Sequence, residues 1–396
     1  MRILHVIPSI ASVRGGTSQA VLEMVTASRE LGIEAEVVTT NDNGFDLLDV
    51  PLGNRIIYQQ IPVWFFPRLS PAIHSIREFA FSRELTAWLW QNIANYDLLH
   101  IHAIFSYTPT IAMVISRLHN IPYIVSPHGL LCDWSLHQST RKKQIYLSLI
   151  ERENLNHSKA LHFTSKQEQD EVSRLGLKSP SFTLPLGLSN SNGIPDARLR
   201  LRQELQLPDD QPLILFMSRL HPKKGLDYLI PALSKLQHHQ FTFILAGSGS
   251  PEYETEVKTL LSRYQLEDRT HCTGFVIGEM KDLLIQGSDV FVLTSHSENF
   301  GISVLEAMAA GLAVIITPGV GLSSVVTSHR VGYVPQLSVD EIASSIAQCL
   351  ANPQEMEAMG NRAHYLISEK YTWKQIIKSL LVVYTSVLQR ISIPAL

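Results

Sequence analysis

The sequence predicts an α/β protein with two domains, each built around a parallel β-sheet of the nucleotide-binding type. Three observations support this prediction. The chain has 396 residues, which is more than a single hydrophobic core usually serves. Short apolar segments alternate with amphipathic segments of helical length, which is typical of parallel strands joined by crossover helices. This alternation stops in a region of turn-forming residues at 184–193 and then begins again.

The first half begins as a strand, a glycine-containing loop, a helix that stops at Gly32, and a second strand. Later apolar segments add further strands, and each is followed by a polar loop and a helical segment. The elements expected in this half are a helix at residues 18–31 and strands at residues 3–7, 36–39, 98–101, 123–126 and 160–163.

The second half repeats this architecture without repeating the sequence. The elements expected there are a polar helix at residues 198–205 and strands at residues 213–217, 241–246, 290–294 and 313–317. A final amphipathic segment at 373–388 follows a helix that ends near Tyr371, and we expect it to fold back onto the first domain. The predicted division is therefore residues 1–188, 189–372 and a returning C-terminal helix at 373–396.

The composition is that of a globular protein, and it excludes several classes of function. A net charge of −3 provides no positive field for nonspecific binding of nucleic acid. The three cysteines, Cys132, Cys272 and Cys349, form no CxxC pair, which argues against disulfides and structural zinc and fits a reducing compartment. No apolar segment reaches the roughly 18 residues that a membrane span needs. We therefore expect a cytoplasmic protein whose contact with a membrane, if any, is peripheral at the inner face.

A loop and a helix start follow the expected strand at 290–294. Ligands of open parallel sheets bind beyond the carboxyl ends of the strands, and free amides at a helix start attract phosphate. The backbone of Phe300, Gly301 and Ile302 is expected to supply such amides, and a glycine lets the backbone come close to the ligand. This segment therefore indicates a phosphate-binding site.

Two glutamates belong to the same segment. Glu298 precedes the helix start and is suited to accept hydrogen bonds from sugar hydroxyls, while Glu306, two turns into the helix, is suited to hold both hydroxyls of a ribose. Asn299 follows Glu298 and is expected to lie beside the same ligand. The simpler interpretation, a surface cap and a solvated helical glutamate, remains open for the pair by itself.

Two cations follow the expected strand at 213–217. Arg219 and Lys224 overhang the end of that strand in the segment SRLHPKKG. A diphosphate leaving group gains negative charge in the transition state, and a fixed guanidinium and ammonium stabilise that charge. By themselves the two side chains fit an ordinary surface equally well.

Three further loops carry weaker signals. Gly15 and Gly16 lie where the first strand turns into the first helix, and they indicate either a ligand loop or a tight turn. His128 follows the strand at 123–126, with His102 as a second candidate, although a single histidine is more often structural.

In the second half, Gly247, Phe275 and Val276 follow further strands. Their backbone groups are placed to meet phosphate, ribose or base, but they fit ordinary turns equally well.

The chain resembles the retaining glycosyltransferase family 4, whose E-x7-E signature matches Glu298 to Glu306 and whose R-x4-K-G pattern matches Arg219, Lys224 and Gly225. The resemblance implies the GT-B fold, in which two Rossmann-like domains face each other across a cleft and a C-terminal helix crosses back to the first domain. Many members have a small residue at the position of Asn299.

The resemblance also implies roles for the site residues. Glu298 is expected to contact the donor sugar and Glu306 the ribose, while Arg219 and Lys224 bind the diphosphate. His128 is expected near the reacting sugar, and the Gly15-Gly16 loop is expected to line the cleft.

The implied activity is transfer of a hexose, with retention and without a metal ion, from a nucleotide-diphosphate sugar to a glycan or lipid-linked saccharide in polysaccharide biosynthesis. UDP-glucose is the first expected donor. A GT-B-fold epimerase and a non-catalytic nucleotide-sugar-binding protein remain the alternatives.

Other nucleotide-binding classes lack their motifs in this sequence. An oxidoreductase of the dinucleotide-binding type needs GxGxxG, but Glu252 occupies the third glycine position after Gly247 and Gly249. There is no Walker A sequence, and no D-x-D pair of a metal-dependent transferase.

Basic and aromatic residues are scattered over the first half, and buried aromatics with a solvated helix start are the favoured explanation. The alternative is a surface that flanks the acceptor or touches an anionic membrane. These residues are Trp64, Phe65, Phe66, Arg68, Arg77, Arg83, Arg141, Lys142 and Lys143.

Overall fold

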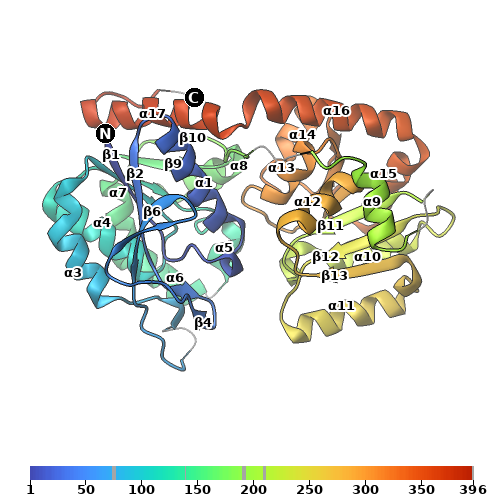
Figure 1. The fold of residues 1–396 in the computed structure, drawn as a ribbon, viewed down its shortest axis with the longest axis horizontal. Helices are drawn as coiled ribbons and strands as arrows, with labels where there is room; N and C mark the ends of the chain where they lie inside the picture. The colour runs from blue at the N-terminus through green and yellow to red at the C-terminus, as the bar shows by residue number, and fades with distance from the viewer. Residues whose placement is uncertain (74–76, 139, 190–192, 208–210, 395–396) are drawn as a thin grey trace. The chain divides into compact units, whose positions relative to one another are not determined.

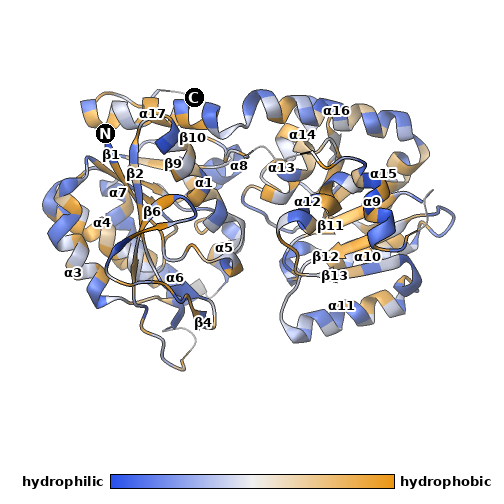
Figure 2. Ribbon diagram, in the orientation of Figure 1, coloured by the Kyte–Doolittle hydropathy of each residue, from blue (hydrophilic) through white to orange (hydrophobic). Residues whose placement is uncertain are grey.

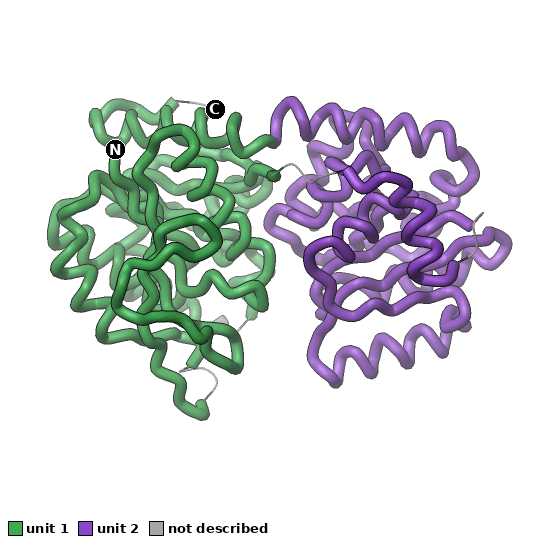
Figure 3. Tube along the Cα trace, viewed as in Figure 1, with its two compact units in different colours: residues 1–189, 372–396 green, residues 190–371 purple. Residues whose placement is uncertain are grey.

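The computed structural model describes residues 1–73, 77–138, 140–189, 193–207 and 211–394 (Figure 1). The chain forms two compact units, which Figure 3 colours separately. Unit 1 comprises Met1–Ser189 and Thr372–Leu396, and unit 2 comprises Asn190–Tyr371. Part of the turn-forming region expected at the boundary, residues 190–192, lies outside the described residues.

Unit 1 contains a sheet with the strand order β10-β9-β8-β7-β1-β2-β6-β5. The chain passes from β1 outward to β2 and β6 on one side and then returns to place β7 on the other side of β1. Ligands of such sheets bind beyond the carboxyl ends of the strands at this switch point, between β1 and β7. The strands are β1 (Arg2–Val6), β2 (Glu34–Thr40), β5 (Arg55–Tyr58), β6 (Ile61–Phe66), β7 (Leu98–His102), β8 (Tyr123–Ser126), β9 (Ala160–Phe163) and β10 (Ser181–Thr183).

The pairing of β5 with β6 departs from the all-parallel sheet that the sequence predicted. These two strands are antiparallel and join the sheet through the parallel pair of β2 and β6. A short antiparallel hairpin, β3 (Asp42–Asn43) with β4 (Asp46–Leu47), lies outside the sheet. Both connections are too short for a crossover helix, so only antiparallel pairing was available to them.

The helices of unit 1 pack around this sheet, and they include the C-terminal helix. Trp373 begins α17, and its indole Nε1 donates a hydrogen bond to Glu23 on α1 at 2.7 Å. The chain end is thereby fastened to the first helix of the same unit. The helices are η1 (Ser12–Arg14), α1 (Gly16–Glu30), α3 (Arg83–Asn92), η2 (Ile93–Asn95), α4 (Tyr107–His119), α5 (Asp133–His137), α6 (Thr140–Tyr146), the π-helix η3 (Leu147–Glu151), α7 (Arg152–His157), α8 (Lys166–Ser173) and α17 (Trp373–Gln389).

Unit 2 contains a parallel sheet with the strand order β13-β12-β11-β14-β15-β16, whose strands β11 and β12 are strongly apolar in Figure 2. Here the switch point lies between β11 and β14, which pair directly. The strands are β11 (Leu213–Met217), β12 (Thr242–Ala246), β13 (Thr270–Gly274), β14 (Val290–Leu293), β15 (Ala313–Ile316) and β16 (Gly332–Tyr333). The helices are α9 (Ala197–Glu204), η4 (Pro222–Lys224), α10 (Leu226–Ser234), α11 (Pro251–Arg263), η5 (Glu267–Arg269), α12 (Gly278–Gly287), α13 (Ile302–Ala309), α14 (Ser323–His329), α15 (Val339–Ala351) and α16 (Pro353–Lys370).

Candidate functional site

The two strongest sequence motifs meet at the switch point of the unit 2 sheet. The basic motif follows β11 and the glutamate motif follows β14, and these strands are neighbours in the sheet. Their loops therefore leave the same edge of the sheet side by side.

Backbone contacts lock the two loops together. Gly225 has φ +68°, and a Cβ atom there would lie 2.0 Å from the carbonyl oxygen of Thr294. The Thr294 hydroxyl donates to the Gly225 carbonyl at 2.9 Å, and the His296 amide donates to the Lys223 carbonyl at 2.9 Å. Only glycine fits this approach, because a side chain would be both strained and in collision with the backbone. The position of Lys224 at the end of β14 follows from this packing.

Lys224 and Glu298 form an ion pair at the joined loops. Their side chains are 11% and 24% exposed, so the pair is partly shielded from water. Backbone bonds fix the loop of Glu298, since its amide donates to the Gly319 carbonyl and its carbonyl accepts from the Gly321 amide, both at 2.8 Å. The ammonium and the carboxylate are thus held next to each other with balanced charge.

The surroundings of Lys224 are electrically positive. Arg219 is exposed on the same loop. Burial, and then the charges of Arg219, Lys223 and Lys224, lower the pKa of His221 below its ordinary value. Such a field attracts an anion.

The helix that follows Glu298 starts at Ile302, as the sequence predicted. Gly301 precedes it with φ +95°, and a Cβ there would lie 3.1 Å from Val320. Phe300 is only 3% exposed, so its side chain belongs to the core and its backbone alone is available to a ligand. Asn299 is half-buried.

Glu306 forms an ion pair that the sequence did not reveal. Its carboxylate accepts a hydrogen bond from the Lys281 ammonium of α12 at 2.8 Å, and its side chain is 20% exposed. Each of the two glutamates of the motif therefore has its own lysine partner. Nothing in the spacing of Lys281 from Glu306 indicated this contact.

The remaining predicted residues of unit 2 lie after β12 and β13. Gly247 has φ +140°, and a Cβ there would lie 1.9 Å from the carbonyl oxygen of Ser218. Its amide donates to the Gly274 carbonyl at 2.8 Å, which ties the loops after the two strands together. Phe275 is 57% exposed and Val276 is half-buried. An exposed aromatic ring at this edge offers a flat apolar surface to a ligand.

In unit 1, the predicted residues lie around its own switch point. Gly15 has φ +91° and caps α1, whose first residue is Gly16. His128 follows β8, and its Nε2 lies 3.1 Å from Nδ1 of His102, at the end of β7. The two histidine candidates are therefore hydrogen-bonded to each other.

Three more histidines line the same face of the sheet, and sequence reasoning missed them. His5, His100 and His162 lie on β1, β7 and β9, and all are fully buried. Burial lowers the pKa of His5 to about 3 and that of His162 to about 4. The signal that could have found them is the two-residue alternation in Leu99-His100-Ile101-His102, which puts both histidines on one face.

The alternative that the basic and aromatic residues of the first half form a surface for an acceptor or a membrane is wrong for some of these residues. The Arg68 side chain is buried and forms an ion pair with Asp42, so it cannot face a membrane or an acceptor. Phe65 and Phe66 are buried, as the favoured explanation required. Within the described ranges, no helix combines the length and the apolar character that crossing a bilayer demands.

Two family models match the chain. The model described as "Glycosyl transferases group 1" matches residues 197–365, and the model described as "Glycosyl transferase 4-like domain" matches residues 15–187. Together they cover most of both units.

Curated relatives extend over nearly the whole chain. An uncharacterized glycosyltransferase of Methanocaldococcus jannaschii is 28% identical over 372 residues, which is 89% of this chain and 90% of the relative. A D-inositol 3-phosphate glycosyltransferase of Xylanimonas cellulosilytica is 25% identical over 95% of this chain and 93% of the relative.

Solved structures with the same fold were also found. HepE of Anabaena, in complex with UDP and glucose, has a TM-score of 0.76 at 22% identity and covers 98% of this chain and 100% of its own. Sucrose-phosphate synthase of Thermosynechococcus elongatus has a TM-score of 0.80 at 20% identity, with 98% and 100% covered.

Proposed function

The chain belongs to the GT4-type glycosyltransferases of group 1, and we propose that it moves a hexose, with retention, from a nucleotide-diphosphate sugar to a saccharide acceptor. The GT-B fold expected from the sequence is confirmed by the structural neighbours. The observation that carries the proposal is the meeting of Lys224, Glu298 and the start of α13 at the switch point of unit 2.

Donor binding is assigned to unit 2. Arg219, Lys224 and the free amides before Ile302 bind the diphosphate, because cations and helix N-termini both favour a phosphate. Glu298 accepts hydrogen bonds from the sugar, and Glu306 holds the ribose. The loops of Gly247, Phe275 and Val276 contact the phosphate, ribose or base.

The donor proposed for the first test is UDP-glucose. The Anabaena neighbour was solved with UDP and glucose, and we carry that donor over as a starting point. Arg219 and Lys224, instead of a metal ion, balance the charge of the leaving diphosphate.

The acceptor hydroxyl attacks from the side of the leaving group, in this proposal. The bond between the anomeric carbon and the diphosphate oxygen breaks as the acceptor oxygen binds that carbon, and a diphosphate oxygen receives the acceptor's proton. Because charge on the diphosphate grows toward the transition state, Arg219 and Lys224 act mainly on turnover. In unit 1, His128 and the Gly15-Gly16 loop are the residues that we propose to contact substrate.

A lipid-linked saccharide is the acceptor class that we favour, with peripheral contact to an anionic membrane. On α6 and the following π-helix, Ile145 is 58% and Leu149 is 74% exposed. Arg141 and Lys142 are exposed at the start of the same segment. Exposed apolar side chains beside basic ones suit an interfacial helix. Sedimentation with liposomes that depends on anionic lipid supports this contact, and sedimentation without that dependence rules it out.

A panel of UDP-, GDP- and ADP-sugars tests the proposed activity. Release of a nucleoside diphosphate from one donor, with a product of unchanged anomeric configuration by proton NMR, is the expected result. Release of an isomer or glycal without any acceptor indicates an epimerase, and a donor that binds but stays intact indicates a non-catalytic protein. Either of these results rejects the transferase proposal.

A further inference from the structure

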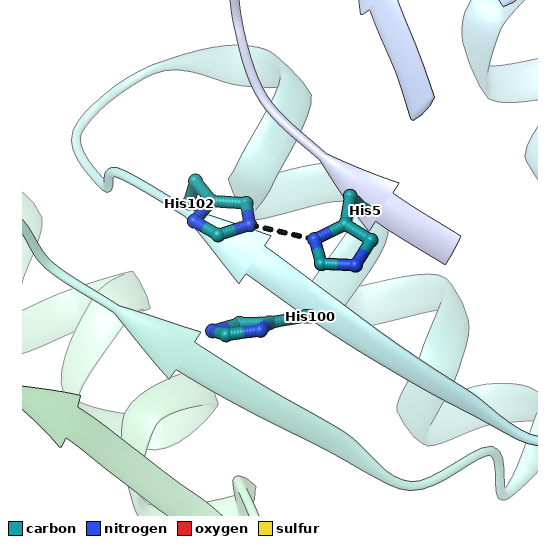
Figure 4. A group of neighbouring side chains, drawn as sticks. All are labelled: His5, His100 and His102. Atoms are coloured by element: carbon teal, nitrogen blue, oxygen red, sulfur yellow. Dashed lines mark hydrogen bonds between the residues drawn. The ribbon is translucent and has the colours of Figure 1, made fainter. Parts of the chain in front are cut away.

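Three histidine rings of unit 1 form one hydrogen-bonded string that ends at the predicted site. His5 Nδ1 lies 3.0 Å from His102 Nε2, and His102 Nδ1 lies 3.1 Å from His128 Nε2. Neighbouring rings have their centres 5.3 Å apart and are nearly coplanar, with interplanar angles of 10° and 19°. Figure 4 shows His5 and His102 pointing toward each other, with the ring of His100 beside them. This geometry is that of in-plane N–H···N hydrogen bonds.

The strand register brings these rings together. His5 on β1 is the register partner of His100 on β7, and His102 on β7 is the partner of Ser126 on β8. Residues two apart on a strand share a face, so these side chains all leave the same side of the sheet. The string therefore runs from the buried sheet to the loop that holds His128.

Among the described residues, the two end nitrogens of the string have no hydrogen-bond partner, and one of them is fully buried. His5 is 0% exposed, and its buried Nε2 forms no hydrogen bond with any described residue. His102 uses both of its nitrogens, one toward each neighbour. At the other end, Nδ1 of His128 has no hydrogen bond to a described residue, and the residue is half-buried.

The unpaired nitrogen of His5 indicates which nitrogen is the donor in each hydrogen bond of the string. If His128 donates from Nε2 to Nδ1 of His102, then His102 donates from Nε2 to Nδ1 of His5. The proton of His5 is then on Nε2, which leaves a buried N–H group without a partner. If His5 donates from Nδ1, His102 donates to His128, and His5 buries only an unpaired lone pair. Orphaned buried N–H groups are rarer than unsatisfied acceptors in proteins. The second arrangement is therefore favoured, and it leaves the proton of His128 on Nδ1.

We propose that His5 and His102 are positioning residues that hold His128 as a neutral ring whose Nδ1 carries the proton and donates it in a hydrogen bond to a substrate oxygen atom. This inference rests on the proposed function, because it supplies the geometry of that same site. Burial lowers the pKa of His128 to about 3 and that of His102 well below its usual value, so both rings are neutral near pH 7.

The backbone of His128 has a separate anchor, which makes the role of the string testable. His128 has φ +52°, a left-handed conformation that is costly for a residue with a side chain. The next amide, of Gly129, donates to the Glu168 carboxylate at 2.6 Å and holds the loop in place. A change at His102 therefore alters the ring of His128 without removing this support.

A second polar string in the same layer provides a matched control. Tyr384 on α17 contacts His100 Nδ1 at 2.7 Å, and Ser126 joins His100 Nε2 and His162 Nδ1 at 2.8 and 2.9 Å. His162 Nε2 then donates to the Leu184 carbonyl at 2.8 Å. Because a carbonyl only accepts, this string has its own fixed direction, and no hydrogen bond recorded among the described residues joins it to His128.

Kinetics of three variants test the proposal with the donor identified in the panel. His102→Asn keeps a donor near the position of Nδ1, while His102→Gln keeps a polar group only near Nε2. We expect His102→Gln to lower kcat about tenfold with KM little changed, the usual scale for losing one hydrogen bond, and His102→Asn to retain most of kcat. His162→Asn, the control, leaves kcat unchanged despite a lower stability. Equal kcat values for the Asn and Gln variants overturn the proposal.

Nitrogen NMR of histidine-labelled protein tests the proton positions independently of activity. The expected spectrum assigns the proton of His128 to Nδ1 and that of His102 to Nδ1, with assignments made from the variants. A proton on Nε2 of His128 overturns the inference, even if the protein is an active transferase. If no donor turns over while the predicted tautomers are present, the proposed function fails and the string stands.

Metal analysis of the purified protein closes the remaining alternative. One nitrogen from each of His5, His100 and His102 lies within 4.8 Å of the others, a spacing that a metal ion could draw together. We expect no stoichiometric metal, because His100 and His102 each use both ring nitrogens in hydrogen bonds and no carboxylate of the described residues bonds to these rings. One bound zinc per chain that is lost in His5→Ala contradicts the string.

Discussion

Replacing Glu298 with glutamine separates product binding from turnover. In the free protein Lys224 is paired with Glu298, so a diphosphate must compete with a carboxylate for the ammonium group. The amide of glutamine keeps the size and the hydrogen-bonding capacity but removes the competing charge. We therefore expect Glu298→Gln to bind UDP more tightly than the wild type and yet to turn over more slowly, because the contact with the sugar is weakened.

The size of the effect follows from the burial of the pair. Two unit charges about 4 Å apart attract by about 4 kcal/mol at an effective dielectric constant of about 20. The Lys224 and Glu298 side chains are 11% and 24% exposed, so solvent reduces this value, and exposed pairs contribute about 1 kcal/mol or less. We take about 1–2 kcal/mol, which corresponds to roughly 5- to 30-fold tighter binding of UDP.

Isothermal titration of UDP into wild type, Glu298→Gln and Glu306→Gln measures this effect. Glu306 is the matched control, because its lysine partner is Lys281 and its assigned ligand is the ribose. We expect its glutamine variant to bind UDP more weakly, by about 1 kcal/mol or roughly fivefold. Weaker or unchanged UDP binding by Glu298→Gln refutes the reasoning, provided that circular dichroism shows an unchanged melting temperature.

Three further predictions concern charge, packing and pH. In steady-state assays, Arg219→Ala and Lys224→Met are expected to lower kcat by roughly 100-fold or more while lowering the affinity for the donor far less. Equal losses of kcat and of donor affinity contradict this expectation. Gly225→Ala is expected to lower the free energy of unfolding, measured with urea, by more than about 2 kcal/mol. Gly176→Ala is the control and is expected to lower it by about 1 kcal/mol, because Gly176 has φ +63° with nothing within 4 Å of an added Cβ atom. Similar losses in the two variants disprove the packing argument. Burial lowers the pKa of His162 to about 4, so the unfolded chain binds more protons between pH 6.5 and 4. The stability of unit 1 therefore falls as the pH drops through that range. Tryptophan fluorescence detects this change, because all five tryptophans belong to unit 1. A stability of unit 1 that does not change with pH in this range contradicts the prediction.

Most of the fold could be predicted because most of its central strands are apolar and buried. The expected strands at 123–126, 160–163 and 213–217 match β8, β9 and β11 residue for residue, and buried parallel strands give such continuous apolar runs. The strands β5, β6, β10 and β16 were missed. Arg55–Tyr58 is only partly buried and Gly332–Tyr333 is two residues long, so neither leaves a strong pattern.

The candidate site could be predicted only where its residues are close in sequence. Glu298 and Glu306 share one loop and helix, so their spacing was informative. The contact of Glu306 with Lys281 depends on how α12 packs near α13, which no local pattern specifies. The string from His5 to His128 likewise depends on strand order, which brings together residues about 100 positions apart in the chain.

The central claim is that Lys224 and its neighbours recognise a diphosphate at the switch point of unit 2. The most direct measurement is the ratio of affinities for the nucleoside diphosphate of the identified donor and for its monophosphate, in wild type and Lys224→Met. We expect the wild type to prefer the diphosphate by tenfold or more, in the range of about 1.4 kcal/mol and above, and the variant to lose most of this preference. A wild type that binds both nucleotides equally, or a variant that keeps the full preference, contradicts the account.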